Sequence, residues 1–417
     1  MSEVAQAPHS SPDGHIPQLR FPEFNVSWNE YKLGSITDVV DSLHTTPKDY
    51  VSSGFPMIRV VDVSNIELDL NKCLNVSEET YRQFTKKYQP KVGDVVLSRV
   101  GTCGASIMLR TKDNVCLGQN TVLLHPKINK DFYHILVKSN IFQVQVSRRV
   151  VGSTQKTLSL KDLKLFKLNI PAKPEQQKIA EFLTAVDNKI EQLIKKQELL
   201  GEYKKGLMQQ IFSQAIRFKA DDGSDFPDWE EKKLGDVVST PVSDGPHLTP
   251  KFVKQGVPFL SVNNLVESKI DFSNVRYISI DDHLVFSKKC KPKKGDVLLG
   301  KAASVGKVAF VETDVEFNIW SPIAMIRPGN SNFSKYIYYC FQTRFILNQI
   351  SKFTNSSSQG NIGMGDINKI IIKLPNKLEQ TKIANFLSSI DTKIEQVGKQ
   401  LDESKQFKKA LLQQMFV

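Results

Sequence analysis

The sequence predicts an α+β fold: two tandem α/β globular units, each followed by a long helix, with the two helices pairing as an antiparallel coiled coil of pseudo-two-fold symmetry. Two observations lead to this prediction. The second half of the chain repeats the first, and in each half short β-type runs give way to a stretch with a helical period. Because duplicated units tend to associate through a two-fold axis, we expect the helices to run antiparallel.

The repeat is carried by motifs that return in the same order. The clearest pairs are Trp28-x4-Leu33-Gly34 with Trp229-x4-Leu234-Gly235, Gly93-Asp94-Val95 with Gly295-Asp296-Val297, and Glu175-Gln176-x2-Ile179 with Glu379-Gln380-x2-Ile383. The offset between the copies drifts only from 201 residues at the tryptophans to 204 at the glutamates. Short insertions therefore separate two copies of one unit.

The repeat divides the chain into five predicted segments: a tail 1–16, a globular unit 17–172, a helix 173–213, a second globular unit 214–376 and a second helix 377–417. The globular units contain β-type runs such as Phe55–Val63 and Asp94–Ser98, which Gly, Pro, Asn and Asp residues interrupt. Helical stretches at Lys130–Val146 and Ser334–Ser351 make these units α+β and not pure barrels.

In the two helical segments, apolar residues recur at alternating spacings of four and three, a period of about 3.5 residues that is typical of a coiled-coil seam. The predicted seam comprises Ile179, Leu183, Val186, Ile190, Leu193, Leu200, Leu207 and Ile211 in the first helix, and Ile383, Leu387, Ile390, Ile394, Val397, Leu401, Leu411 and Met415 in the second. At about 1.5 Å per residue, each helix would form a rod of about 60 Å, with the globular units at opposite ends. A helix that lies on its own domain is the alternative.

Polar residues interrupt the seam at Gln197, Lys204, Ser404 and Lys408. They either set the register of the two helices or mark the places where the helices splay apart.

The chain is basic, with 56 Lys and Arg against 44 Asp and Glu, a net charge of +12. The helical segments carry +1 and +2 of this charge, so +9 lies in the globular units and tails. Such an excess favours a polyanionic partner, nucleic acid before a membrane surface. No apolar run approaches the roughly 18 residues of a membrane span. The first residues also lack the features of a signal peptide, so we expect a cytoplasmic protein.

The chain lacks the motifs of catalysis and cofactor binding. No Gly-x-Gly-x-x-Gly follows a predicted strand, no Gly-x-Ser-x-Gly occurs, and the Asn/Asp-Pro-Pro-aromatic box of amino-methyl transfer is missing. The nearest phosphate loop, Gly300 to Lys307, has one residue too many between its glycines, and Val308 stands where Ser or Thr would bind magnesium. We predict a strand–turn–strand there. Dispersed cysteines favour reduced thiols over a metal site. We therefore expect a binding protein with no catalytic residue, metal site or cofactor.

Polar loops are the candidate readers of base edges and phosphates, because these residue types supply the required donors and acceptors. They are His44, Thr46, Lys48, Arg99, Thr102, Gln119, Asn120, Thr154, Gln155 and Lys156 in the first unit, and His247, Thr249, Lys251, Asn263, Lys301, Ser304, Lys307, Ser358, Gln359 and Asn361 in the second. The His-x-Thr-Pro-Lys loops lead this set, because both copies keep a basic, hydroxyl-rich turn. For any single residue, turn chemistry or a solvated loop is the alternative.

These motifs resemble those of the specificity (S) subunits of type I restriction–modification systems. The resemblance covers the chain after about residue 17 and depends on the three repeated motifs and on the run from Leu160 to Pro171 before the first helix. It implies that each globular unit is a target-recognition domain for half of a split DNA site, within a complex that methylates adenine. It also implies that the helices act as a spacer and as a docking surface for two methyltransferase (M) subunits. S-adenosylmethionine, ATP and magnesium would then be bound by those subunits and by restriction (R) subunits.

Two other classes of protein remain open. A self-contained DNA methyltransferase or nuclease would need a cofactor or metal site and would modify DNA unaided. An adaptor would use the coiled coil to hold two protein partners and would show no salt-dependent affinity for DNA.

Overall fold

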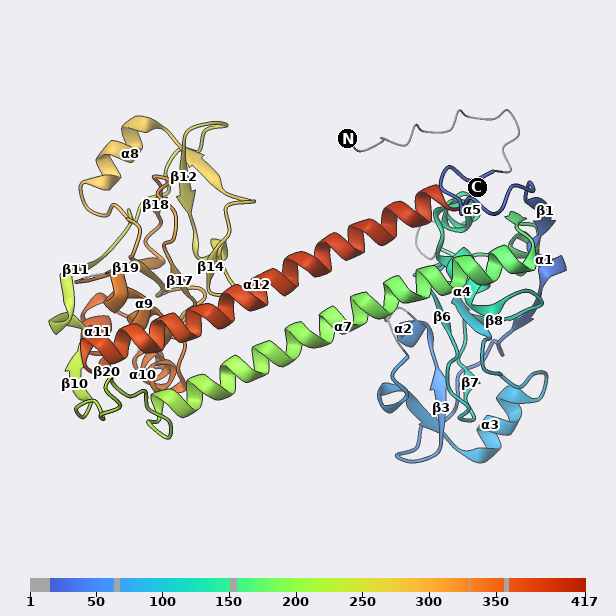
Figure 1. Ribbon diagram of the computed structural model, residues 1–417, viewed down its shortest axis with the longest axis horizontal. Coiled ribbons are helices and arrows are strands. Elements are labelled where there is room, and N and C mark those ends of the chain that lie inside the picture. The colour runs from blue at the N-terminus through green and yellow to red at the C-terminus, as the bar shows by residue number, and fades with distance from the viewer. Residues whose placement is uncertain (1–15, 64–67, 151–155, 330, 356–359) are drawn as a thin grey trace. The chain divides into compact units, whose positions relative to one another are not determined.

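The computed structural model describes residues 16–63, 68–150, 156–329, 331–355 and 360–417. The chain forms two compact units: unit 1 is Met1–Lys195 with Gly398–Val417, and unit 2 is Lys196–Val397. The long helices α7 (Lys173–Phe212) and α12 (Lys377–Gln414) each contribute to both units (Figure 1). The predicted mixed fold of helices and strands is confirmed.

Unit 1 is built on three small sheets. Its other elements are β1 (Asn29–Lys32), α1 (Leu33–Ile36), β2 (Thr37–Asp41), β3 (Phe55–Ile58), α2 (Val60–Val63), η1 (Leu70–Lys72), β4 (Leu74–Val76), α3 (Glu78–Thr85), β5 (Val95–Ser98), β6 (Ser106–Met108), β7 (Cys116–Leu117), β8 (Thr121–Pro126), α4 (Lys130–Lys138), α5 (Asn140–Arg149), α6 (Leu160–Lys164) and β9 (Lys167–Ile170). The main sheet is antiparallel with strand order β2-β8-β5-β6, a second has the order β4-β3-β7, and β1 pairs with β9.

Unit 2 repeats this plan. Its other elements are β10 (Glu230–Lys233), η2 (Leu234–Asp236), β11 (Val238–Asp244), β12 (Val257–Leu260), η3 (Val262–Asn264), β13 (Leu265–Val266), β14 (Lys269–Ile270), β15 (Arg276–Ile278), α8 (Ile280–Ser287), β16 (Val297–Gly300), β17 (Val308–Phe310), β18 (Asn318–Ile319), β19 (Ile323–Pro328), α9 (Ser331–Cys340), α10 (Arg344–Asn355), α11 (Met364–Lys369) and β20 (Ile371–Leu374). The sheet orders β11-β19-β16-β17, β15-β12-β18 and β10-β20 match those of unit 1, and a short β13-β14 pair is added.

The central strand of each main sheet is buried on both faces. Because successive side chains of a strand point to opposite faces, Val95 and Leu97 of β5 join one core while Val96 joins another. In unit 2, Leu298 of β16 likewise joins one core, while its neighbours Val297 and Leu299 join the other. The fully apolar runs of the sequence therefore become strands between two cores.

The long helices pack antiparallel within each unit. In unit 1, Leu411 and Met415 near the end of α12 share a core with Ile179 and Leu183 near the start of α7. In unit 2, Ile211 at the end of α7 shares a core with the first turns of α12. Every predicted seam residue is buried or half-buried, so the apolar period is used for packing between the helices as well as on the domains.

The repeated Glu-Gln motif anchors each domain to the start of its helix. The Glu175 carboxylate lies at the beginning of α7, where it accepts hydrogen bonds from the Arg20 guanidinium (2.7 Å) and from the Trp28 indole N–H (3.2 Å). The Gln176 side-chain amide donates to the carbonyl of Pro171 at 2.8 Å. In unit 2, the same carboxylate contacts join Glu379 to Arg217 and Trp229.

Within the described part of the chain, no helix is both long enough and apolar enough to span a membrane. The five cysteines are free thiols, and four of them are buried.

Candidate nucleic-acid interface

In unit 1, the structure brings three of the predicted loops together beside the main sheet. The backbone N–H of Arg99, directly after β5, donates to the carbonyl of Asn120 at 3.1 Å. The backbone N–H of Gly101 donates to the carbonyl of Lys156 at 3.1 Å, and that of Leu158 donates to the carbonyl of Arg99 at 2.8 Å. Segments far apart in the sequence thus form one polar surface.

Asp41, at the end of β2, links this surface to the first His-x-Thr-Pro-Lys loop. Its carboxylate lies 2.9 Å from the Nε2 atom of His44 and 3.4 Å from the Nε atom of Arg99. The Arg99 Nη2 atom lies 3.3 Å from the Nδ1 atom of His44. A guanidinium only donates, so this geometry assigns the proton of a neutral imidazole to Nε2, which donates to Asp41. The His44 side chain nevertheless stays 65% exposed.

Unit 2 contains the equivalent cluster with more positive charge. The Asp244 carboxylate is almost fully buried and lies 3.3 Å from His247 Nε2, 2.5 Å from Lys289 Nζ and 3.1 Å from Lys301 Nζ. Burial alone would raise the pKa of Asp244, but the hydrogen bonds from Lys289 and Lys301 outweigh it and hold the pKa below its usual value. The carboxylate therefore stays ionised and holds the cations in place.

The loops of unit 2 converge through matching backbone bonds. The N–H of Lys301 donates to the carbonyl of Pro322 at 2.8 Å, and that of Ile362 donates to the carbonyl of Lys301 at 2.9 Å. The turn after β16 needs Gly306, whose φ of +88° suits a residue without a side chain. The antiparallel strands β16 and β17 and the turn between them form the predicted strand–turn–strand.

The predicted residues fall into five groups. His44, Arg99, Asn120 and Lys156 meet in unit 1, and His247 and Lys301 meet in unit 2, with Asn361 next to Ile362. Four residues lie on the turns that carry Arg99, Asn120 and Lys301, namely Thr102, Gln119, Ser304 and Lys307. Four more are exposed on the two His-x-Thr-Pro-Lys loops, namely Thr46, Lys48, Thr249 and Lys251. Asn263 lines a separate cavity. Four predicted residues lie outside the described part of the chain, namely Thr154, Gln155, Ser358 and Gln359. For all the predicted residues of both units, contact with DNA stays a prediction.

Sequence reasoning missed the two central carboxylates and Lys289. A signal for them was present, because Asp41 and Asp244 each stand three residues before a loop histidine. Lys289 likewise belongs to a Lys-Lys pair that recurs at Lys86-Lys87. In each cluster the carboxylate fixes the positions of the basic side chains around it.

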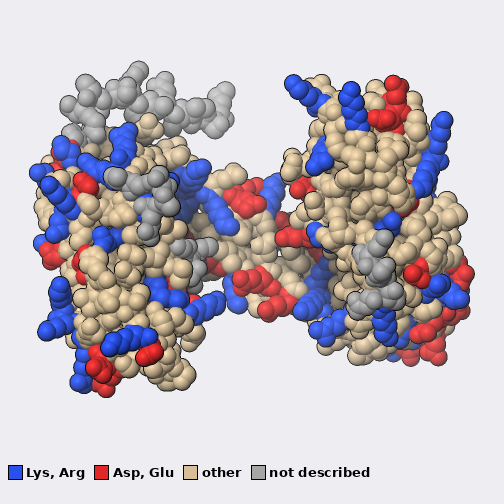
Figure 2. Space-filling model, turned by 180° about the vertical axis from the view of Figure 1, so that it is seen from behind, with Lys and Arg blue, Asp and Glu red and all other residues tan. Residues whose placement is uncertain are grey.

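On the face seen in Figure 2, positive charge is distributed over each unit. Figure 2 shows lysine and arginine side chains over the visible face of both units, with acidic side chains among them. On this face each unit therefore presents cations at several separate points.

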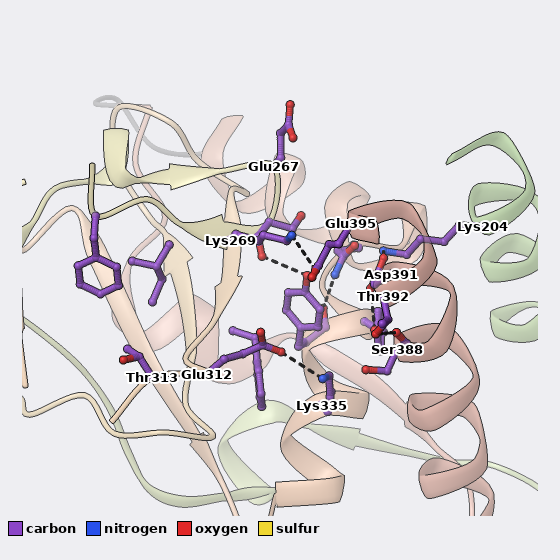
Figure 3. Close-up of a pocket in the computed structure, with 17 residues that line it drawn as sticks. Lys204, Glu267, Lys269, Glu312, Thr313, Lys335, Ser388, Asp391, Thr392 and Glu395 are labelled. Atoms are coloured by element: carbon purple, nitrogen blue, oxygen red, sulfur yellow. Dashed lines mark hydrogen bonds and ion pairs between the residues drawn. The ribbon is translucent and has the colours of Figure 1, made fainter. Parts of the chain in front are cut away.

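A second concave surface lies where the globular part of unit 2 meets the long helices (Figure 3). Three ion pairs line it: Lys204 with Asp391 (2.6 Å), Lys269 with Glu395 (2.6 Å) and Lys335 with Glu312 (3.1 Å). We interpret this cavity as a polar joint between domain and helices.

The equivalent cavity of unit 1 is lined by Lys408, Asp187, Lys138, Arg110 and His134. Burial lowers the pKa of His134 to about 3, and the nearby cations Lys138, Arg110 and Lys408 add to this effect. Its Nε2 atom is buried and has no hydrogen-bond partner among the described residues.

Comparison with known proteins finds one family twice, once in each half of the chain. The family model described as the type I restriction modification DNA specificity domain matches twice, over residues 25–200 and 227–403. The chain is 25% identical over 422 residues to the putative type I restriction enzyme MjaX specificity subunit of Methanocaldococcus jannaschii, covering 96% of this chain and 93% of that protein. It is 25% identical over 405 residues to the type I restriction enzyme MjaIX specificity subunit of the same organism, covering 92% and 91%.

Among solved structures, the S subunit of a type I restriction–modification system from M. genitalium has a similar fold. The TM-score is 0.61 at 15% sequence identity, and the match covers 96% of this chain and 99% of that chain.

Proposed function

Because the chain belongs to the type I restriction–modification DNA specificity family, with two family domains in one chain, we propose that each unit reads one half of a bipartite DNA target. The observation that carries this proposal is the cluster around Asp41, which recurs around Asp244 with different cations. The two equivalent clusters present different basic side chains, which suits a DNA target whose two halves differ in sequence.

The buried carboxylates act as positioning groups in this proposal. Each one holds the basic side chain that follows the central strand, Arg99 in unit 1 and Lys301 in unit 2. Fixed cations cost less conformational entropy when they bind a phosphate or a base edge. Exposed lysines on the neighbouring turns, such as Lys48 and Lys251, would then neutralise phosphates.

We assign the chemistry to partner subunits. In this proposal, two methyltransferase subunits dock on the long helices, bind S-adenosylmethionine and methylate adenine, and restriction subunits use ATP and magnesium to cleave DNA. The sequence supports this division, because the segment Gly300–Val308 has the wrong spacing and residues for a phosphate loop and no methyl-transfer box occurs. We place this complex in the cytoplasm, where it meets DNA.

The test is a map of methylated adenines in cells that express the chain together with its methyltransferase subunits. We expect one bipartite motif that disappears when the chain is omitted. The variant Arg99→Ala should weaken recognition of one half-site, and Lys301→Ala should weaken recognition of the other. Methylation at an unchanged motif without this chain would contradict the proposal. Methylation by this chain alone, with only S-adenosylmethionine added, would contradict the assignment of catalysis to partners.

A further inference from the structure

A cavity of about 290 Å³ in unit 2 lies beside the candidate DNA-binding loops. Trp320, which follows β18, forms part of its wall and donates its backbone N–H to the carbonyl of Leu260 at 2.9 Å. The next residue, Ser321, donates to the carbonyl of Pro246 at 3.2 Å, directly before His247. The backbone next to the cavity wall is therefore bonded to the loop that carries His247.

The walls combine aromatic faces with exposed polar side chains. The Arg276 guanidinium lies over the ring of Phe252, 4.8 Å from its centroid, and Phe259 packs between Phe252 and Trp320. Stacking on an aromatic ring restrains the guanidinium while its N–H groups remain in the plane of the fork. Asn263 is exposed at the same cavity.

Asn264, the neighbour of Asn263, has a structural role that explains why the two asparagines differ. Its side-chain oxygen accepts from the N–H of Ser261 at 3.0 Å, and its amide donates to the carbonyls of Asp271 and Asn274. Asn264 thus fixes the backbone of this loop, and Asn263 is presented from a rigid turn.

Unit 1 has different chemistry at the same place in the fold. The parallel pairing of Ile58 with Leu117 matches that of Leu260 with Ile319, so Arg59 corresponds to Ser261 and Gly118 to Trp320. Arg59 is held by Asp62 through contacts of 3.1 and 3.3 Å.

The Arg59 side chain occupies the space over Gly118, where an added Cβ would lie 3.1 Å from the Arg59 Cγ. One unit therefore fills this position with a clamped arginine, and the other leaves a cavity with an aromatic wall.

From this difference we propose that the cavity of unit 2 reads a purine in its half-site, with Arg276 and Asn263 as the residues that determine specificity. Arginine pairs with O6 and N7 of guanine, and asparagine pairs with N6 and N7 of adenine, so both address the N7 edge that purines share. The inference rests on the proposed function, because it presupposes that unit 2 reads DNA. The inference places discrimination between bases at a position where the two units differ. The clusters around Asp41 and Asp244, which both units share, position basic side chains.

The experiment uses the full chain co-expressed with its methyltransferase subunits, and the readout is the sequence motif of methylated sites. In the variants Arg276→Ala and Asn263→Ala, the preference at one purine position of one half-site should fall about 10-fold or more. The other half-site should stay unchanged. Arg344→Ala, which removes an exposed arginine that does not line the cavity, is the matched control and should leave the motif intact.

The variant Arg276→Lys separates base reading from simple charge. It keeps the positive charge but loses the planar fork, so it should also relax the motif. If Arg276→Ala weakens methylation of all sequences equally and leaves the motif unchanged, Arg276 contacts phosphate and the inference is wrong. An unchanged motif in Arg276→Ala and Asn263→Ala would also overturn it while leaving the proposed function intact. If the unsubstituted chain directs methylation to no sequence motif, the proposed function itself is wrong.

Discussion

Lys204 of α7 and Asp391 of α12 form an ion pair in unit 2, with Nζ and Oδ1 2.6 Å apart. Asp391 also accepts the hydroxyl of Tyr339 at 2.7 Å. In unit 1, Lys408 and Asp187 form the equivalent pair with the helices exchanged. Each lysine stands at an interruption of the apolar seam. Of the two alternatives for these interruptions, the pairs therefore favour a role in setting the register over a place where the helices splay apart.

The variant Asp391→Ala should destabilise unit 2 by about 1–3 kcal/mol, because it leaves the largely buried Lys204 without its carboxylate. A double-mutant cycle with Lys204→Ala, followed by urea unfolding, should give a favourable coupling energy between the two side chains. The exposed pair Lys399 and Glu403 on the same helix is the control, and its removal should change little. A coupling energy near zero for Lys204 and Asp391 would show that this pair does not hold the helices in register.

Unit 1 should lose stability as the pH falls from about 6.5 toward 3. The pKa of His134 is lowered from 6.5 to about 3 in the fold. Between these two pH values the His134 imidazole is therefore protonated in the unfolded chain and neutral in the folded chain. This residue contributes a slope of at most about 1.4 kcal/mol per pH unit. The variant His134→Tyr carries the residue that unit 2 has at the equivalent position, Tyr338, and should reduce the slope in thermal unfolding between pH 7 and 5. Equal slopes in both proteins would contradict this assignment.

The variant Glu379→Ala should destabilise unit 2 by about 2–4 kcal/mol, because it removes the acceptor shared by Arg217 and Trp229 from a buried position. The buried Glu379 carboxylate also raises the pKa of Arg217 through the same hydrogen bonds. Chemical unfolding measures the loss. Asp228, which lies 3.8 Å from Arg217 but is fully exposed, supplies the control variant Asp228→Ala, and a comparable loss there would mean that burial is not the cause.

Inserting four helix-forming residues after Lys196 tests whether the helices act as a spacer. A coiled coil can absorb such an insertion, which adds about 6 Å and a rotation of about 40°. Since B-form DNA rises about 3.4 Å per base pair and turns once in about 10–10.5 pairs, we expect the gap between half-sites to lengthen by one or two base pairs. Four residues inserted at the exposed turn of Gly223 should leave the gap unchanged. A constant gap in the helix variant, or new bases within a half-site, would exclude the spacer role.

The sequence by itself determined the duplication, the two long helices and their antiparallel seam. These features depend on local signals, since the helical period of Ile179 to Ile211 and the turn residues around the strands act over a few neighbouring positions. The matched motifs then required both halves to fold alike, as the equivalent sheets of the two units confirm.

Only the tertiary structure decided which residues meet. Asp41 reaches Arg99 across 58 positions of sequence, and Phe416 packs against Trp28 across nearly the whole chain, with ring centroids 6.2 Å apart. No local pattern encodes such contacts, because they depend on how strands and helices are brought together in space. For the same reason the sequence named the histidine loops but missed Lys289. Its role arises only when the turn after α8 places its ammonium group beside the buried carboxylate of Asp244.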